Sequence, residues 1–181
     1  IYTHVMSIHL VNNSPDFSPS CSLALLGFLR REPSYGYEIY QRLNRSDLRG
    51  IWRLKQSRLY AMLARLEAAG LLWTTAEPGD GRPPRKVFHL TEAGANAFRD
   101  WLEQPVGHPR DVRLEFMLKL YFAVEAGGET AAQLIARQQA TGVIWLRERR
   151  AASGGAFSQA VAAYRQAHIE AIVNWLDGLA A

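Results

Sequence analysis

Apolar residues recur at helical spacing in three segments near the start of the chain. The leucines within residues 20–32 step by about one helical turn, which predicts a first helix ending near Glu32, because Pro33 disfavours continuation. Ser20 is placed to cap its first turn. A short second helix is expected around residues 39–43, and a third over residues 55–69, which is stopped by a glycine.

The next segment changes to the pattern of a β-hairpin. Residues 71–76 and 85–90 read as two strands, and residues 78–84 between them are a dense turn signal of glycine, proline and aspartate. Thr91 then caps a fourth helix that stops at Pro105. The order of three helices, a hairpin and a further helix is that of a winged helix-turn-helix.

The second half of the chain is predicted to be helical throughout. Residues 106–109 are a candidate boundary, and helical patterns follow over about 110–126, 129–150 and 156–179. We therefore expect a mainly α protein. Residues 1–19 are expected to form an N-terminal tail. Residues 20–105 are expected to form a winged helix-turn-helix DNA-binding domain with a hairpin wing, and residues 106–181 an α-helical dimerisation domain.

One apolar stripe runs along the whole of the last predicted helix. Its members are Phe157, Val161, Tyr164, His168, Ile172, Trp175 and Leu179. A helix of this apolarity needs a partner, so the stripe is either a dimer seam or a buried core face. We favour the seam, because a winged helix needs a partner to read two half-sites one DNA turn apart. His168 is interpreted as a packed histidine, not as a pH switch or ligand.

The third helix has the pattern of a DNA-reading helix. Its inward face carries Leu59, Met62, Leu63 and Leu66. Its outward face carries Ser57, Ala61 and Ala64, flanked by Arg58, Tyr60 and Arg65, with Lys55 and Gln56 at the N-terminus. Small residues let a helix sit deep in the major groove, and arginines reach phosphates or guanine edges. The alternative is an ordinary surface helix whose alanines raise helix propensity.

Charge supports the same reading. The net charge is only +4, but residues 45–86 hold nine basic and four acidic residues, and residues 49–58 hold four basic residues and no acid. Arg82, Arg85 and Lys86 lie on the hairpin tip and its return strand. Such a wing can place cations along the phosphate backbone or in the minor groove. A solvated basic face is the alternative interpretation.

The composition of the chain excludes several other classes of protein. Cys21 is the only cysteine, so an internal disulfide and a cysteine-based metal cluster are ruled out, and we expect it to be a small core residue. No apolar run is long enough for a membrane span, and no signal peptide is recognisable at the start. The histidines are scattered, and no nucleophile or phosphate-loop motif occurs. We expect a cytoplasmic non-enzyme that needs no cofactor or metal.

Four stretches together resemble the PadR family of bacterial transcriptional regulators. They lie in the first, second and third predicted helices and in the return strand with the following turn: residues 23–29, 35–39, 57–72 and 81–94. The resemblance, closest to the larger subclass with a long C-terminal region, implies a homodimer that represses from a palindromic operator. It also implies release by a small aromatic ligand. The DNA contacts that it implies are Tyr35, Tyr37, Ser57, Arg58, Tyr60, Arg82, Arg85 and Lys86.

The resemblance is incomplete in the wing. The family usually has paired tyrosines where this chain has Val87 and Phe88, so hydroxyl contacts from that point are not expected. Aromatic residues of the second half are candidates for stacking on a flat effector, with core packing as the alternative. These candidates are Trp101, Phe116, Tyr121 and Trp145. As an alternative function we consider a winged helix that binds another protein without reading DNA.

Overall fold

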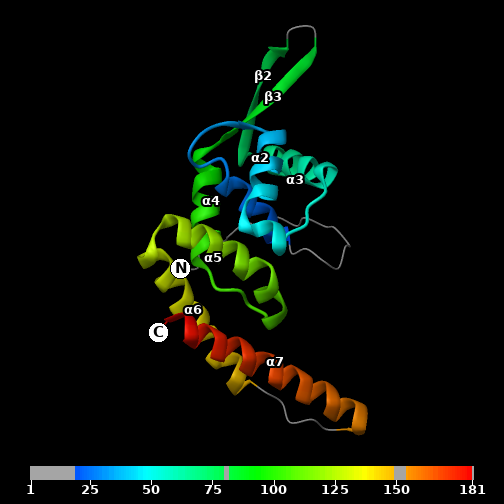
Figure 1. The fold of residues 1–181 in the computed structure, drawn as a ribbon, viewed down its shortest axis with the longest axis vertical. Helices are drawn as coiled ribbons and strands as arrows, with labels where there is room; N and C mark the ends of the chain where they lie inside the picture. The colour runs from blue at the N-terminus through cyan, green and yellow to red at the C-terminus, as the bar shows by residue number, and fades with distance from the viewer. Residues whose placement is uncertain (1–18, 80–81, 149–153, 181) are drawn as a thin grey trace.

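The computed structural model describes residues 19–79, 82–148 and 154–180. The molecule is elongated, with a β-hairpin projecting from one end and a long helix crossing the other (Figure 1). In the described part of the chain, three α-helices precede the hairpin and four follow it, with short 3₁₀ helices between some of them. This confirms the expected mainly α fold with an N-terminal winged helix-turn-helix.

The first helix is shorter than predicted. A 3₁₀ helix, Pro19–Leu23, leads into α1, Ala24–Gly27, so the expected continuation to Glu32 is wrong. Gly27 faces the ring of Phe122, and a Cβ atom on it would come within 2.5 Å of that ring. The helix ends at this tight contact, and the following residues turn to lead the chain into the sheet.

Ser20 does not act as the predicted helix cap. The α-helical turns begin at Ala24, and no side chain caps them. The Ser20 hydroxyl instead donates a hydrogen bond of 2.5 Å to Glu115, far along the sequence. Ser20 thus bonds to a residue far along the sequence and not to the backbone of the neighbouring helical turn.

The sheet has three antiparallel strands, β1 (Ser34–Tyr35), β2 (Leu72–Gly79) and β3 (Arg82–Leu90), in the order β1-β3-β2. The hairpin is longer than predicted, since its strands take up most of the expected turn. The register shifts around Pro78, which lacks the N–H that a regular ladder needs. β1 was not predicted, because two residues cannot show an alternating pattern.

The helices of the winged-helix half are α2 (Gly36–Arg45), α3 (Gln56–Ala68) and α4 (Glu92–Glu103). The four predicted inward residues of α3 are all buried: Leu59, Met62, Leu63 and Leu66. Thr91 accepts a 2.9 Å hydrogen bond from the Gly94 N–H, which confirms the predicted cap of α4. A 3₁₀ helix, Asp47–Gly50, connects α2 to the approach of α3.

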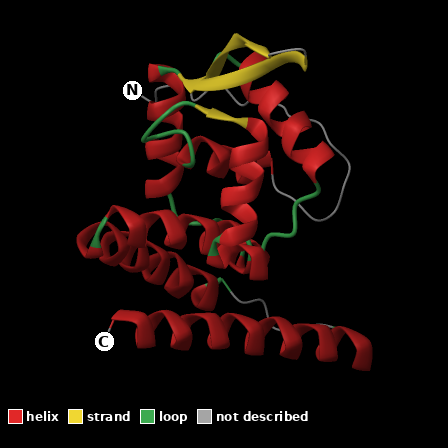
Figure 2. Cartoon of the chain, turned by 45° about the horizontal axis from the view of Figure 1, so that its top comes forward, coloured by secondary structure: helices red, strands yellow, loops and turns green. Residues whose placement is uncertain are grey.

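The second half contains α5 (Glu115–Ala126), α6 (Gly128–Arg147) and α7 (Ala156–Ala180). The single helix predicted over 110–126 is split into a 3₁₀ helix, Pro109–Arg113, and α5. The end of the predicted 129–150 helix, at residues 149–150, lies outside the described residues. Figure 2 shows the helices of the second half gathered at one end of the molecule, away from the strands. Apolar side chains from α1 to α7 form one continuous core.

Cys21 is a core residue, as predicted. It is almost fully buried, and burial, helped by Glu115 and Asp111, raises the pKa of its thiol to about 12. Among the described residues, no helix is both long and apolar enough to cross a membrane. The same part of the chain holds no group of three or more His, Cys, Asp or Glu side chains arranged for a metal ion.

Candidate nucleic-acid interface

The outward face of α3 is built as the sequence suggested. Ser57, Ala61, Ala64 and Arg65 are exposed, and Lys55 and Gln56 are exposed at the helix N-terminus. Tyr60 is exposed on one flank, and Arg58 is partly buried on the other. The predicted residues of this helix therefore share one surface, which is small at its centre and polar or basic around it.

Tyr60 also joins α3 to the start of α2. Its ring lies over Gly36, where a Cβ atom would come within 2.5 Å of the Tyr60 Cε1 atom. Only glycine leaves room for this contact, which gives a physical reason for the glycine between Tyr35 and Tyr37. Tyr37 is exposed beside it, and the Gln41 amide donates a 2.5 Å hydrogen bond to its hydroxyl.

Tyr35 connects α2 to the wing. Its hydroxyl donates to the carboxylate of Glu77 on β2, and this hydrogen bond raises the pKa of Tyr35. Its backbone N–H donates to Glu38 over 3.3 Å, and Ser34 donates to the same Glu38 oxygen over 2.7 Å. The predicted contact residue Tyr35 thus has a partner within the protein, one that the sequence did not reveal.

The return strand places Lys86 beside the C-terminal end of α3. Arg85 and Lys86 are exposed on β3, and the Lys86 ammonium lies 3.6 Å from the Glu67 carboxylate. Glu67 also accepts a 2.6 Å hydrogen bond from the Thr74 hydroxyl on β2. The backbone of Arg82 opens β3, but its side chain lies outside the described part of the structure.

Glu67 was missed as part of this surface, although the sequence held a signal for it. An acidic residue near the C-terminal end of a helix is disfavoured by the helix dipole and calls for a cationic or hydrogen-bonding partner. Here Lys86 and Thr74 supply both. Glu67 thereby connects the base of the wing to α3.

An aromatic pair on the wing was also missed. Trp73 and His89 face each other across β2 and β3, and their rings stack at 4.0 Å. The Thr75 hydroxyl lies 2.9 Å from the His89 Nε2 atom. Because side chains alternate along a strand and Phe88 is buried, this pair lies on the sheet face away from the core.

The seven stripe residues of α7 fall into two groups. Phe157 and Tyr164 are 82% and 70% exposed. His168 is also exposed, so the interpretation of it as a packed core histidine is wrong for the single chain. Ile172 is buried, and Trp175 packs edge-on against Phe116 with ring centroids 6.0 Å apart. Val161 is half-buried and Leu179 is exposed. The first half of α7 projects beyond α6 in both ribbon views (Figures 1 and 2).

The four aromatic effector candidates lie within or against the core. Trp101, Phe116 and Trp145 are buried, and Tyr121 is half-buried with its pKa raised by that burial. The indole N–H groups of both tryptophans have partners: Trp101 donates to Glu115 over 3.2 Å and Trp145 to the Gly107 carbonyl over 3.0 Å. The described contacts of these residues are those of core side chains.

Comparison with known proteins agrees with this arrangement. Residues 25–100 match the model of the transcriptional regulator PadR-like family. This part of the chain is a PadR-like domain. PadR of Bacillus subtilis, a negative transcriptional regulator, is 32% identical over 117 residues, which span 64% of this chain and 63% of that protein. The PadR-like family consists of regulators, in agreement with the expectation of a non-enzyme.

Two further similarities are to a regulator and to a solved structure. A Mycobacterium tuberculosis protein named as a transcriptional regulator is 28% identical over 90 residues, 50% of this chain and 47% of its own length. The crystal structure of B. subtilis PadR with operator DNA covers 88% of this chain and 97% of that one, at 25% identity and a TM-score of 0.46. The chain thus aligns with less than two thirds of either sequence relative.

Proposed function

We propose that this PadR-like chain is a sequence-specific transcriptional regulator that binds duplex DNA through α3 and the wing. The observation that carries the proposal is the outward face of α3, where Ser57, Ala61 and Ala64 are exposed between basic and polar flanks. A helix of this shape can approach base edges closely. Arg85 and Lys86 on the adjacent wing supply cations for the phosphate backbone.

The chain is further proposed to act as a homodimer on a palindromic operator. The support is the first half of α7, where large apolar side chains such as Phe157 and Tyr164 are exposed in the single chain. A two-fold dimer would cover this surface and would present two copies of α3 to two half-sites. The three C-terminal helices fit the larger PadR-like subclass.

Repression and release by a small aromatic effector complete the proposal. Repression is supported by the B. subtilis relative, which is named as a negative regulator. Effector binding is supported by the resemblance to the family alone, because the aromatic candidates Trp101, Tyr121 and Trp145 make the contacts of core side chains. Both would act in the cytoplasm of a bacterial cell.

The variant Ala61→Glu tests the reading helix. A carboxylate at the centre of the outward face would meet base edges and phosphates, so operator affinity should fall by about 1–3 kcal/mol, roughly 5- to 150-fold. Fluorescence anisotropy with labelled duplex measures this. The matched control is Ala136→Glu, which adds the same charge to an exposed site on α6 and should leave affinity unchanged.

Two results would contradict the proposal. Equal affinities of the two variants would mean that α3 does not face DNA. Binding of the unaltered chain that does not weaken as salt rises would mean that phosphates are not contacted, which would favour the protein-interaction alternative.

A further inference from the structure

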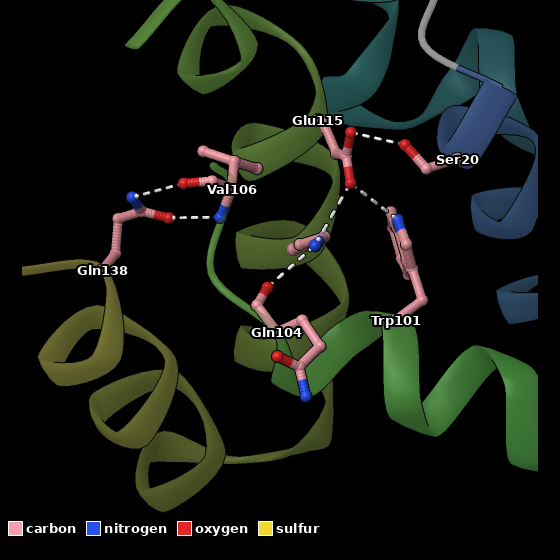
Figure 3. Close-up of polar contacts among 7 residues, drawn as sticks. Ser20, Trp101, Gln104, Val106, Glu115 and Gln138 are labelled. Atoms are coloured by element: carbon pink, nitrogen blue, oxygen red, sulfur yellow. Dashed lines mark hydrogen bonds and ion pairs between the residues drawn. The ribbon is translucent and has the colours of Figure 1, made fainter. Parts of the chain in front are cut away.

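The segment that joins the two halves of the chain is held by side chains from α5 and α6. Lys119 donates a 2.8 Å hydrogen bond to the Gln104 carbonyl, and Trp145 donates over 3.0 Å to the Gly107 carbonyl. Gln138 accepts from the Val106 N–H over 2.8 Å and donates to the Val106 carbonyl over 3.3 Å (Figure 3). The backbone of this joining segment, residues 104–107, is therefore hydrogen-bonded along its length to the C-terminal helices.

Gln138 is the centre of this arrangement. It is 0% exposed, and Val106 beside it is buried. Its side-chain amide pairs with both backbone groups of Val106, the N–H and the carbonyl, as a neighbouring strand would, which fixes both the position and the orientation of the segment. A buried glutamine without such partners would be costly, so its presence in an otherwise apolar face of α6 is accounted for by this contact.

A buried ion pair fixes the other end of the segment. Lys119 is 2% exposed, and its ammonium lies 3.2 Å from Glu115 and 5.2 Å from the centre of the Trp101 ring. Glu115 also accepts hydrogen bonds from Ser20 and Trp101 (Figure 3). Through Glu115, the pair connects Ser20 and α4 to α5. Through Lys119, it connects α5 to the Gln104 carbonyl.

We propose that Gln138, together with Lys119, is a specificity-determining positioning residue that sets which spacing between operator half-sites the dimer accepts. The joining segment lies between α4 of the winged-helix half and the helices that carry the proposed seam. The shared core joins the two halves, and the hydrogen-bonded segment adds directional contacts that fix their angle. A loose segment would therefore let the separation of the two copies of α3 vary. This inference rests on the proposed DNA-binding homodimer, because half-site spacing has meaning only for a dimer.

The test compares Gln138→Leu with the matched control Gln133→Leu, which makes the same change at an exposed site on α6. The probe is the inverted-repeat duplex selected from a random pool by the unaltered chain, together with versions lengthened or shortened at the centre by one or two base pairs. The unaltered chain and the control should lose about tenfold or more per change in spacing. Gln138→Leu should lose less than about threefold, and its affinity for a single half-site should be unchanged.

The outcomes are distinguishable. If Gln138→Leu keeps the spacing dependence of the unaltered chain, or if the unaltered chain itself ignores spacing, the inference is overturned. If the unaltered chain selects no duplex, the proposed function fails instead. Amide hydrogen exchange at Val106 decides the structural part in either case, and also if the variant does not fold. Protection as strong as that of the α6 core supports a fixed segment, and rapid exchange refutes it.

Discussion

Glu67 shows at the scale of one residue how charge on the proposed DNA surface is balanced. Its carboxylate lies 3.6 Å from the Lys86 ammonium and accepts a hydrogen bond from Thr74. The ion pair holds a wing cation close to α3, and it also places a negative charge beside a surface proposed to meet phosphates. Such a contact favours a defined wing position at the expense of affinity.

The variant Glu67→Gln separates these two effects. An amide keeps an oxygen for Thr74 but removes the charge, so Lys86 becomes available to DNA. We expect affinity for any duplex to rise about twofold to fivefold, the size of a surface ion pair, and most strongly at low salt. Glu103→Gln, at an exposed glutamate paired with Arg137 on α6, is the control and should change nothing. A fall in affinity with Glu67→Gln would show that Glu67 acts chiefly by positioning the wing.

Individual residues differ in how far the sequence could have revealed their roles. The burial of Cys21 and of the leucines of α3 follows from local patterns and was predicted. The contact between Gly36 and Tyr60 was not, because it joins two helices. The same holds for Gly94, where a Cβ atom would come within 2.1 Å of the Leu71 carbonyl oxygen. Each of these glycines is required by a distant segment.

At the scale of elements, α7 differs most from what its sequence pattern predicts, which is one apolar face along the whole helix. The stripe read from the sequence was open to two interpretations, a seam or a core face. The structure divides it: near the end of the helix Ile172 is buried and Trp175, partly exposed, contacts Phe116, whereas Phe157 and Tyr164 are exposed near its start. Periodicity identifies an apolar face, but the length over which a neighbour covers it depends on where α6 ends.

The variant Tyr164→Glu tests the proposed seam. Tyr164 is 70% exposed in the single chain, so a glutamate there should leave the folding of the monomer intact. In the dimer it would bury a charge, and sedimentation velocity should show monomers. Gln166→Glu adds the same charge on the opposite side of α7, where it should leave the dimer intact. If the Tyr164→Glu variant remains a dimer, the dimer interface does not lie in this part of α7.

The other elements were predicted where the local signal was complete. The cap at Thr91, the hairpin and the order of the helices all appear in the structure. The early end of α1 and the strand β1 were not predicted, because both depend on partners far along the chain. Gly27 meets a ring from α5, and Ser34–Tyr35 form a strand only because β3 lies beside them.

Side-chain contacts connect the described elements of the molecule from the wing to the C-terminal helices. Tyr35 and Glu67 fix the wing to α2 and α3, and the Glu115–Lys119 pair with Gln138 fixes the winged-helix half to the C-terminal helices. One hydrophobic core runs through both halves. We propose that these connections let a dimer present its two copies of α3 at a set separation.

The most direct test of the proposed DNA-binding homodimer is the selection of bound duplexes from a random pool by the full chain. A dimer that reads DNA through α3 should select an inverted repeat whose half-site centres lie about one DNA turn, or a multiple of it, apart, with affinity that falls steeply as salt rises. The repeat would report the reading helix and the two-fold dimer together. A pool without an enriched sequence, or an enriched single site without an inverted copy, would contradict it.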